Sequence, residues 1–312
     1  MAGQTHSVIT FATNKFSYVQ FALNCAQSIL IHNDIPIFIV SNLDFSIPPK
    51  YKDKIFIIPA KPEHLPLGIG MKLHIDEYLQ TEHSLFIDSD CICYGDLNEI
   101  FKAAEGMDIT VAGNIVPTEN WCGPEQANTI KQNFDIDKII RFNGGLYYLK
   151  KSALTTAIFD KAREIGEKYD NYGFQRIKDK WINEEGPVSI SMMLHKQTPI
   201  PDNGHIITDL FTDNRPAKIN ALTGARQLRN RPRSHQKHRS WYPDKYMPLL
   251  IHFGGNNLSS YPYKSQKSLL KLKSNFVPAP IAAMLVNVFI HAPYKTYHFL
   301  HKYLKPGNND VS

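Results

Sequence analysis

Cysteine is scarce in this chain of 312 residues: there are four, and their spacing does not fit a structural metal site. Free thiols in a reducing compartment are therefore expected, and a disulfide-stabilised secreted domain is disfavoured. The first residues show no basic stretch followed by an apolar run, so no secretory signal is expected. The apolar run at 276–290 is too short to span a bilayer. These features predict a cytoplasmic protein, with contact at the cytoplasmic face of a membrane left open.

Acidic residues are missing from the interval 214–243, although the net charge of the whole chain is only +6. This basic segment has almost no apolar periodicity, which predicts an exposed, mobile loop, and its charge indicates an anionic partner. Nucleic acid is disfavoured, because Trp241 and Tyr242 could stack on bases but stand in no recognised nucleic-acid-binding module. The cations of the segment are Arg215, Lys218, Arg226, Arg229, Arg231, Arg233, Lys237 and Arg239.

Hydrophobic residues make up 43% of the chain and charged residues 21%, which is ordinary for a globular protein with a buried core. Apolar runs at 35–42, 54–60 and 84–88 are typical of strands buried on both faces. Helical periodicity at 17–33 and 152–169 alternates with them. Strands that alternate with helices form mostly parallel sheets covered by helices, so the expected fold class is α/β and Rossmann-like. We expect a catalytic domain at 1–260 and a helical extension at 261–312.

Two carboxylates, Asp88 and Asp90, follow the apolar run at 84–87. In a strand, residues i and i+2 point to the same face, so both side chains project together at the strand's carboxyl end. Open α/β sheets bind ligands at that edge. Two carboxylates this close repel each other unless a cation lies between them, and oxygen ligands suit Mg²⁺ or Mn²⁺. The alternative is a turn that carries two solvated aspartates.

Several stretches in order along the chain resemble glycosyltransferase family 8, over about residues 6–258. They are the strand and turn at 9–29, the helix at 70–79, the Asp-x-Asp strand, "FNGGLYYLKK" at 142–151 and "IHFGG" at 251–255. The resemblance implies a GT-A fold and metal-dependent transfer of a sugar from a nucleotide sugar, with UDP as the expected nucleotide. It also implies a glycan or glycolipid acceptor and retention of the anomeric configuration. Phosphorylated lipopolysaccharide would suit the basic segment.

The resemblance assigns Asp88, Asp90 and His252 to a metal ion, with Mn²⁺ preferred to Mg²⁺ because imidazole tolerates Mn²⁺ better. The alternative for His252 is a histidine satisfied at a strand end. Lys72 would meet a phosphate or the sugar, or be an ordinary surface lysine. The full set implied for the nucleotide sugar is Thr10, Ala12, Asn14, Tyr18, Lys72, Asp88, Ser89, Gly144, Gly145, Gly254 and Asn257.

Three further residues, Asn143, Glu184 and Glu185, are the candidates for catalysis. The glycines after Asn143 are expected on a strand, where they let a ligand approach the backbone, or in a β-bulge. Glu185 stands where the family carries glutamine, and its carboxylate could stabilise positive charge or act as a nucleophile. Two glutamates at a helix start also suit the helix dipole without any catalytic role.

The sequence departs from the family at two places. Gly186 replaces the second aspartate of an Asp-Gln-Asp motif, and Asn257 replaces a lysine that contacts the diphosphate. A phosphotransferase of the haloacid dehalogenase type is the alternative enzyme, although its Asp-x-Asp motif lies near the start of the domain. The alternative to an enzyme is a protein that binds nucleic acid or an anionic surface through the basic segment. The tail at 264–305 is predicted helical, with breaks at Pro278, Pro280 and Pro293. It either lies in a membrane interface or packs on the catalytic domain.

Overall fold

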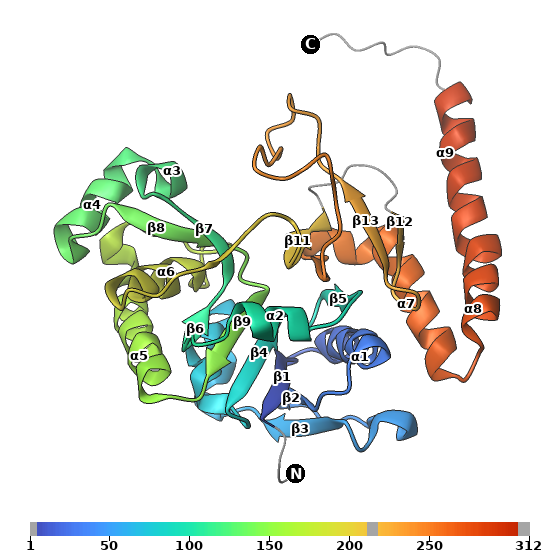
Figure 1. Cartoon of the computed structure of the whole chain (residues 1–312), viewed down its shortest axis with the longest axis horizontal. Coiled ribbons are helices and arrows are strands. Elements are labelled where there is room, and N and C mark those ends of the chain that lie inside the picture. Colours follow the sequence, from blue (N-terminus) through green and yellow to red (C-terminus); the bar gives the residue numbers. More distant parts are fainter. Residues whose placement is uncertain (1–4, 211–217, 305–312) are drawn as a thin grey trace.

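The computed structural model describes residues 5–210 and 218–304 (Figure 1). The first four residues of the basic segment, among them Arg215, and the last residue of the predicted helical tail lie outside these ranges. The expected division at residue 260 is a boundary that the fold does not test, so it stays a prediction.

The centre of the molecule is a six-stranded mixed sheet with the order β3-β2-β1-β4-β9-β6. The first four strands are parallel, and β9 runs antiparallel to both β4 and β6. The predicted α/β class with a mostly parallel sheet is therefore confirmed. The strands are β1 (His6–Phe11), β2 (Ile37–Ser41), β3 (Ile55–Pro59), β4 (His83–Ile87), β6 (Ile109–Thr110) and β9 (Leu146–Lys150).

Strand β2 is buried along its whole length, as its unbroken apolar run predicts. Strand β3 has an equally apolar sequence, but the prediction of burial on both faces is wrong for it. It forms the edge of the sheet, and Ile57 is 40% exposed. An apolar run alone cannot distinguish an edge strand from a central one, because the difference lies in which neighbours pair with it.

Helices cover both faces of the central sheet. Helix α1 (Phe16–His32) packs on one face through residues such as Ala26, while α5 (Ala153–Glu167) and α6 (Glu185–Leu194) pack on the other through residues such as Phe159. Ser152 caps α5 by accepting a hydrogen bond from the backbone N–H of Thr155. Helix α6 begins at Glu185, so Pro187 lies in its first turn, where proline is tolerated because the first N–H groups of a helix have no partner within it.

Three small sheets extend the central one. The first contains β10 (Ile200–Pro201), β7 (Ala112–Pro117) and β8 (Lys138–Phe142); the second contains β11 (Ile207–Asp209), β15 (Leu250–His252) and β5 (Cys91–Cys93); the third contains β12 (Lys218–Asn220), β13 (Ala225–Arg229) and β14 (Lys245–Tyr246). The other short elements are η1 (Pro49–Tyr51), η2 (Pro62–Tyr78), α2 (Asn98–Ala103), α3 (Glu119–Cys122), α4 (Pro124–Phe134), η3 (Tyr169–Tyr172) and η5 (Gly255–Ser259).

The described part of the basic segment is more ordered than an exposed loop. Strand β13 lies within it and pairs with β12 and β14. Leu228 and Tyr242 are buried, and the Arg226 guanidinium donates a hydrogen bond to the Tyr94 carbonyl at 2.8 Å. The prediction of an exposed loop is therefore wrong for β13. The strand has too few apolar residues to show a period in the sequence, but those few are enough to anchor a hairpin.

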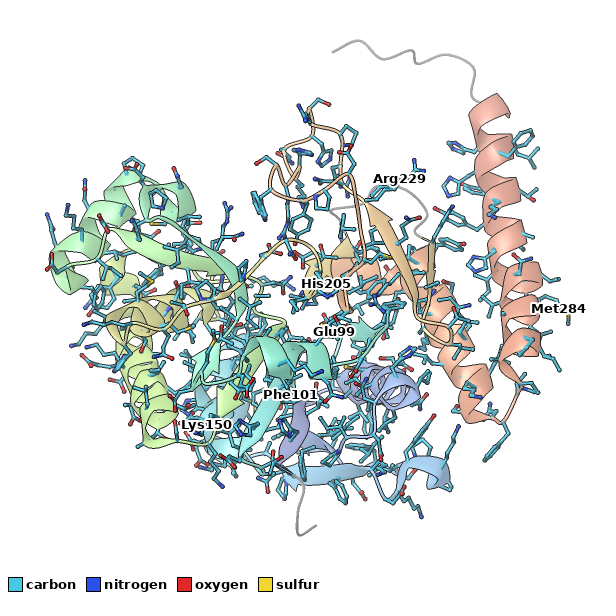
Figure 2. The ribbon with its side chains drawn as sticks, in the orientation of Figure 1. Glu99, Phe101, Lys150, His205, Arg229 and Met284 are labelled. Atoms are coloured by element: carbon cyan, nitrogen blue, oxygen red, sulfur yellow. The ribbon has the colours of Figure 1, made fainter. Side chains whose placement is uncertain are left out.

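The tail forms α7 (Tyr261–Ser274), α8 (Ala279–Val286), the π-helical turn η6 (Asn287–His291) and α9 (Ala292–Leu304). The predicted break at Pro278 is confirmed, whereas Pro280 and Pro293 lie in the first turns of α8 and α9 and break neither helix. Helices α8 and α9 run beside the body of the protein as one rod, and Met284 points away from it (Figures 1 and 2). Within the described ranges, no helix is long and apolar enough to cross a bilayer.

Candidate functional site

The two predicted aspartates lie in the turn between β4 and β5. The Asp88 backbone N–H donates to the Gly145 carbonyl at 3.0 Å, and the Asp88 carbonyl accepts from the Cys91 N–H at 3.0 Å. These bonds fix the turn at the carboxyl end of a central parallel strand. Asp88 and Asp90 each keep about a fifth of their side-chain surface exposed, so a ligand can reach both.

Long-range strand pairing brings His252 to the same turn. Strand β15 pairs antiparallel with β5 in a register that sets His252 opposite Cys91, next to Asp90. His252 Nε2 lies 3.1 Å from Asp90 Oδ1 and 3.8 Å from Asp88 Oδ2. One ligand atom from each of the three residues falls within 4.8 Å of the other two. The three residues predicted to share a metal are thus brought together, and two carboxylates with one imidazole are a donor set that suits Mn²⁺.

Asp209 is a member of this site that the sequence analysis missed. Strand β11 pairs parallel with β15 and places Asp209 beside His252. Asp209 Oδ1 lies 3.1 Å from His252 Nδ1 and accepts a hydrogen bond from Asn143 Nδ2 at 2.8 Å. Burial opposes the charge of His252, but Asp90 and Asp209 outweigh burial and hold the pKa of His252 well above its usual value. A short apolar stretch that ends in aspartate was the only signal available in the sequence.

Arg239 of the basic segment completes the carboxylate network behind His252. Its guanidinium donates to Asp209 Oδ2 and to Asp202 Oδ2, each at 3.0 Å. Tyr242 also donates to Asp202, at 2.6 Å. The part of the segment around Arg239 is therefore tied to the metal-binding candidates through buried polar contacts.

Lys72 lies inside the site and is not an ordinary surface lysine. Its side chain is 13% exposed, and Nζ contacts Asp88 Oδ2 at 2.7 Å, the Gly144 carbonyl at 2.9 Å and Glu184 Oε1 at 3.1 Å. Burial disfavours its charge, but Asp88 and Glu184 more than compensate and raise the pKa of Lys72. Glu184 also accepts from the Tyr147 hydroxyl at 3.2 Å. Lys72 and Glu184 thus form a buried ion pair beneath Asp88.

Glu185 differs from Glu184 because, among the described residues, no cation lies within ion-pair distance of it, although Lys72 acts on it from further away. Its Oε1 accepts the Gly144 N–H at 2.8 Å, and burial together with the charge of Glu184 raises its pKa to about 7. A Cβ on Gly144 would lie 2.6 Å from Glu184 Oε1 and 3.0 Å from Glu185 Oε1. Gly144 is therefore a glycine because two carboxylates pack against its backbone.

The prediction that Asn143, Gly144 and Gly145 lie on a strand or in a bulge is wrong. They form the turn between β8 and β9. The Asn143 Oδ1 accepts the Gly145 N–H at 2.9 Å, so the side chain bridges its own turn and Asp209. The turn consequently contacts Asp88, Glu185 and the carboxylate partner of His252.

The residues predicted around the nucleotide fall into two environments. Thr10 and Ala12 are fully buried near α1, and the Thr10 hydroxyl has no hydrogen-bond partner among the described residues. Asn14 is exposed in a left-handed conformation (φ 67°), a conformation that asparagine tolerates, and its amide donates to the Leu65 carbonyl. Tyr18 is 41% exposed on the first turn of α1. Their contact with a nucleotide stays a prediction.

The remaining predicted residues lie close to the metal candidates in sequence. Ser89 separates the two aspartates and is partly exposed. Gly254 follows β15, and a Cβ there would lie 3.3 Å from His252 Nε2. Asn257 belongs to η5, the 3₁₀ turn after the glycines. Their binding roles also stay predictions.

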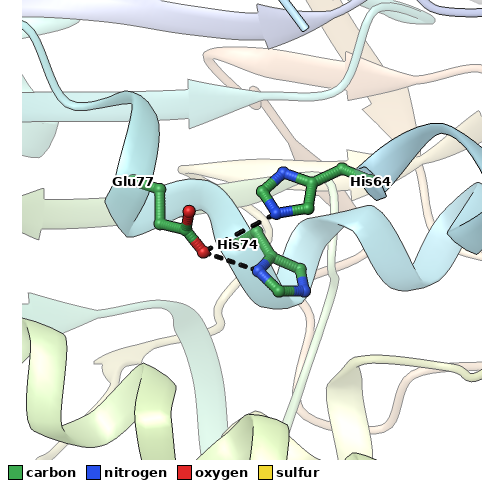
Figure 3. A group of neighbouring side chains, drawn as sticks. All are labelled: His64, His74 and Glu77. Atoms are coloured by element: carbon green, nitrogen blue, oxygen red, sulfur yellow. Dashed lines mark hydrogen bonds and ion pairs between the residues drawn. The ribbon is translucent and has the colours of Figure 1, made fainter. Parts of the chain in front are cut away.

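A second group that could share an ion, His64, His74 and Glu77 on η2, was not predicted (Figure 3). His74 Nδ1 and His64 Nε2 lie 2.7 and 3.8 Å from Glu77 Oε1. The two imidazoles stack with centroids 4.0 Å apart and planes 28° apart. Imidazole binds metals through a lone pair in the ring plane, so nearly parallel stacked rings cannot both point at one ion. Because Lys61 pairs with Glu77 as well, we interpret this group as a hydrogen-bonded cluster that fixes η2.

No known family model and no curated protein sequence matches this chain. Its structure resembles that of an active-site mutant of LgtC, at 16% identity and a TM-score of 0.54, over 86% of this chain and 95% of that one. The galactosyltransferase LgtC in complex with donor and acceptor sugar analogs is similar at 15% identity and a TM-score of 0.51, over 80% of this chain and 87% of that one. The glycosyltransferase GlyE of Streptococcus pneumoniae TIGR4 gives 18% identity but only 0.39, over 64% of this chain and 45% of GlyE. The chain therefore spans about half of GlyE, and by its topology and its likeness to LgtC it has the GT-A fold.

Proposed function

We propose that this chain is a metal-dependent glycosyltransferase of the family 8 type, which moves a sugar from a UDP-sugar to a glycan or glycolipid. One observation carries the proposal: Asp88, Asp90 and His252 converge from two distant segments at the carboxyl edge of the sheet in a GT-A fold. The likeness to LgtC, whose structure holds donor and acceptor sugar analogs, supports it as a likeness of fold. The same fold disfavours the haloacid dehalogenase alternative.

Asp88, Asp90 and His252 would hold Mn²⁺, or Mg²⁺ in its place. When bound, the ion would neutralise charge on the diphosphate leaving group. Asp209 would support the metal-binding histidine by accepting a hydrogen bond from the ring nitrogen that does not face the ion. Lys72 Nζ contacts Asp88 Oδ2, the oxygen that also lies 3.8 Å from His252 Nε2, and balances its charge.

Glu185 is the residue that we assign to the anomeric centre. A carboxylate that is held by a backbone N–H, and that lacks a cationic partner among the residues around it, is free to face positive charge that develops on the sugar. Stabilisation of that charge and covalent capture of the sugar are the two roles open to it, and both are compatible with retention. Asn143 would position Gly144 and Gly145 at the edge of the same pocket.

The tail and the basic segment would place the enzyme at an anionic surface. Helix α8 packs on α7 through Ala282 and Val286, while large apolar side chains of the rod face solvent. We propose peripheral contact with the cytoplasmic face of the membrane through this rod. In a vesicle sedimentation assay, Phe289→Glu should weaken binding to anionic vesicles, whereas Ile115→Glu, at an exposed position on β7 outside the tail and the basic segment, should not. The exposed side chains are Ile281, Met284, Val288, Phe289, Tyr297, Phe299 and Leu300.

Release of UDP from a panel of UDP-sugars in the presence of Mn²⁺ tests the proposed reaction. Asp88→Asn should lower the rate at least a hundredfold, because the proposed ion loses a charged ligand. The exposed Asp44→Asn serves as the control and should leave the rate unchanged. Equal rates for the two variants, each verified as folded, would contradict the proposal.

A further inference from the structure

Arg141 differs from Arg239, the other arginine that contacts Trp241, because among the described residues no carboxylate lies within ion-pair distance of Arg141. Arg163, Arg176 and Arg239 each contact a carboxylate at 3.0 Å or less. Arg141 is partly buried on β8, two residues before Asn143. A partly buried cation without a countercharge carries an unbalanced charge, which an anionic ligand would balance.

Trp241 holds the Arg141 side chain in place. The guanidinium carbon lies 4.5 Å from the centre of the indole ring, a cation–π contact. Trp241 is 39% exposed, and its Nε1 lies 3.4 Å from Asp202 Oδ2, the same oxygen that accepts from Arg239. The network that holds His252 therefore also fixes the ring on which Arg141 stacks.

Stacking occupies the flat face of a guanidinium and leaves the N–H groups on its edge free. Those groups form a fork that matches two oxygens of a carboxylate or a phosphate. Arg239, the neighbouring cation, already shares its charge with Asp202 and Asp209, so Arg141 supplies the uncompensated charge at this place.

We propose that Arg141, oriented by Trp241, binds an acidic substituent, carboxylate or phosphate, on the acceptor. The inference rests on the proposed function, because it places the acceptor beside the donor site. The donor diphosphate is assigned to Asp88, Asp90 and His252, and Asp209 and Arg239 lie between His252 and Trp241. Arg141 therefore meets the second substrate.

Binding of three probes tests this assignment: glucose 6-phosphate, glucuronate and glucose, each titrated into protein with Mn²⁺ and UDP and followed by calorimetry. The phosphate and carboxylate arms distinguish the two acidic groups. We expect at least one acidic probe to bind about tenfold more tightly than glucose, and Arg141→Gln to abolish that preference. Lys138→Gln, an exposed cation on the same strand, should keep it.

Two further variants separate charge from orientation. Arg141→Lys retains the charge without the fork, and Trp241→Ala retains the arginine without its support, so both should lose part of the preference. UDP binding should be unchanged in all variants, which keeps this test separate from that of the donor site. Equal affinity of acidic and neutral probes for the wild type, binding of none of them, or loss of UDP binding in Arg141→Gln would overturn the inference.

Discussion

Glu184 and Glu185 are neighbours at the start of α6, but among the described residues only Glu184 has a cation within ion-pair distance, and Lys72 acts on Glu185 from further away. Lys72 Nζ lies 3.1 Å from the Glu184 carboxylate. The Glu185 carboxylate accepts a hydrogen bond from the Gly144 N–H and is repelled by the charge of Glu184. The raised pKa of Glu185, about 7, means that its ionisation opposes folding. A carboxylate that opposes folding in this way is a candidate for function, which agrees with the role proposed for Glu185.

Glu185→Gln should therefore stabilise the metal-free protein in a pH-dependent way. The folded-state pKa lies above the ordinary value of 4.5, so the stability of the wild type falls as pH rises between about 4.5 and 7. Glutamine removes that loss, and we expect the free energy of unfolding to rise by about 1–3 kcal/mol at pH 8, with a smaller change at pH 4.5. Denaturant unfolding at both pH values measures this, and the exposed Glu105→Gln is the control. A gain that is the same at both pH values would contradict the assignment.

Asp209→Asn should weaken metal binding without removing a proposed ligand. The carboxylate fixes the His252 ring through Nδ1, and loss of such a partner typically lowers metal affinity about 10–100-fold. Asp202→Asn is the matched control, because Asp202 also binds Arg239, whereas the carboxylates in contact with His252 are those of Asp88, Asp90 and Asp209. Titration of Mn²⁺ by calorimetry should give a raised Kd for Asp209→Asn alone. Equal Kd values for the two variants would assign Asp209 a purely structural role.

At the scale of elements, the turn between β8 and β9 is the most tightly constrained part of the site. Gly144→Ala would press a methyl group to 2.6 Å from a buried carboxylate oxygen, and we expect a loss of about 1–3 kcal/mol in unfolding free energy. At Gly70 the nearest atom to an added Cβ is 3.6 Å away, so Gly70→Ala is the control and should cost little. Thermal unfolding compares the two. A Gly144→Ala protein as stable as Gly70→Ala would show that the carboxylates move freely.

Local periodicity predicted the elements that are long or uniformly buried, such as β2, α1 and α5. It also predicted that Asp88 and Asp90 end a buried strand. It could not predict Asp209, because β11 has three residues and its position depends on pairing with β15, about forty residues later in the chain. The pairing of β5 with β15, which delivers His252, joins segments about 160 residues apart, and only the family resemblance indicated that contact.

At the scale of the whole molecule, charge is organised around the edge of the central sheet. Asp209 lies next to His252, and Asp202 and Asp209 both lie next to Arg239. The described cations of the basic segment lie on the β12–β13–β14 sheet and on the stretch around Arg239, which the ion pairs of Arg239 attach to these two carboxylates. The sequence predicted the charge of this segment but not its attachment, because Asp202 and Asp209 lie outside it. The anionic acceptor and the membrane contact follow from this arrangement as proposals.

Thermal unfolding with UDP, in the presence and absence of Mn²⁺, tests the central claim most directly. At about 100 times its dissociation constant, UDP should add about 2.7 kcal/mol of stability. We predict a rise in melting temperature that requires Mn²⁺ and disappears in Asp90→Asn. A well-folded protein that shows no shift with UDP, or the same shift without the metal or in Asp90→Asn, would contradict a metal-dependent donor site at Asp88, Asp90 and His252.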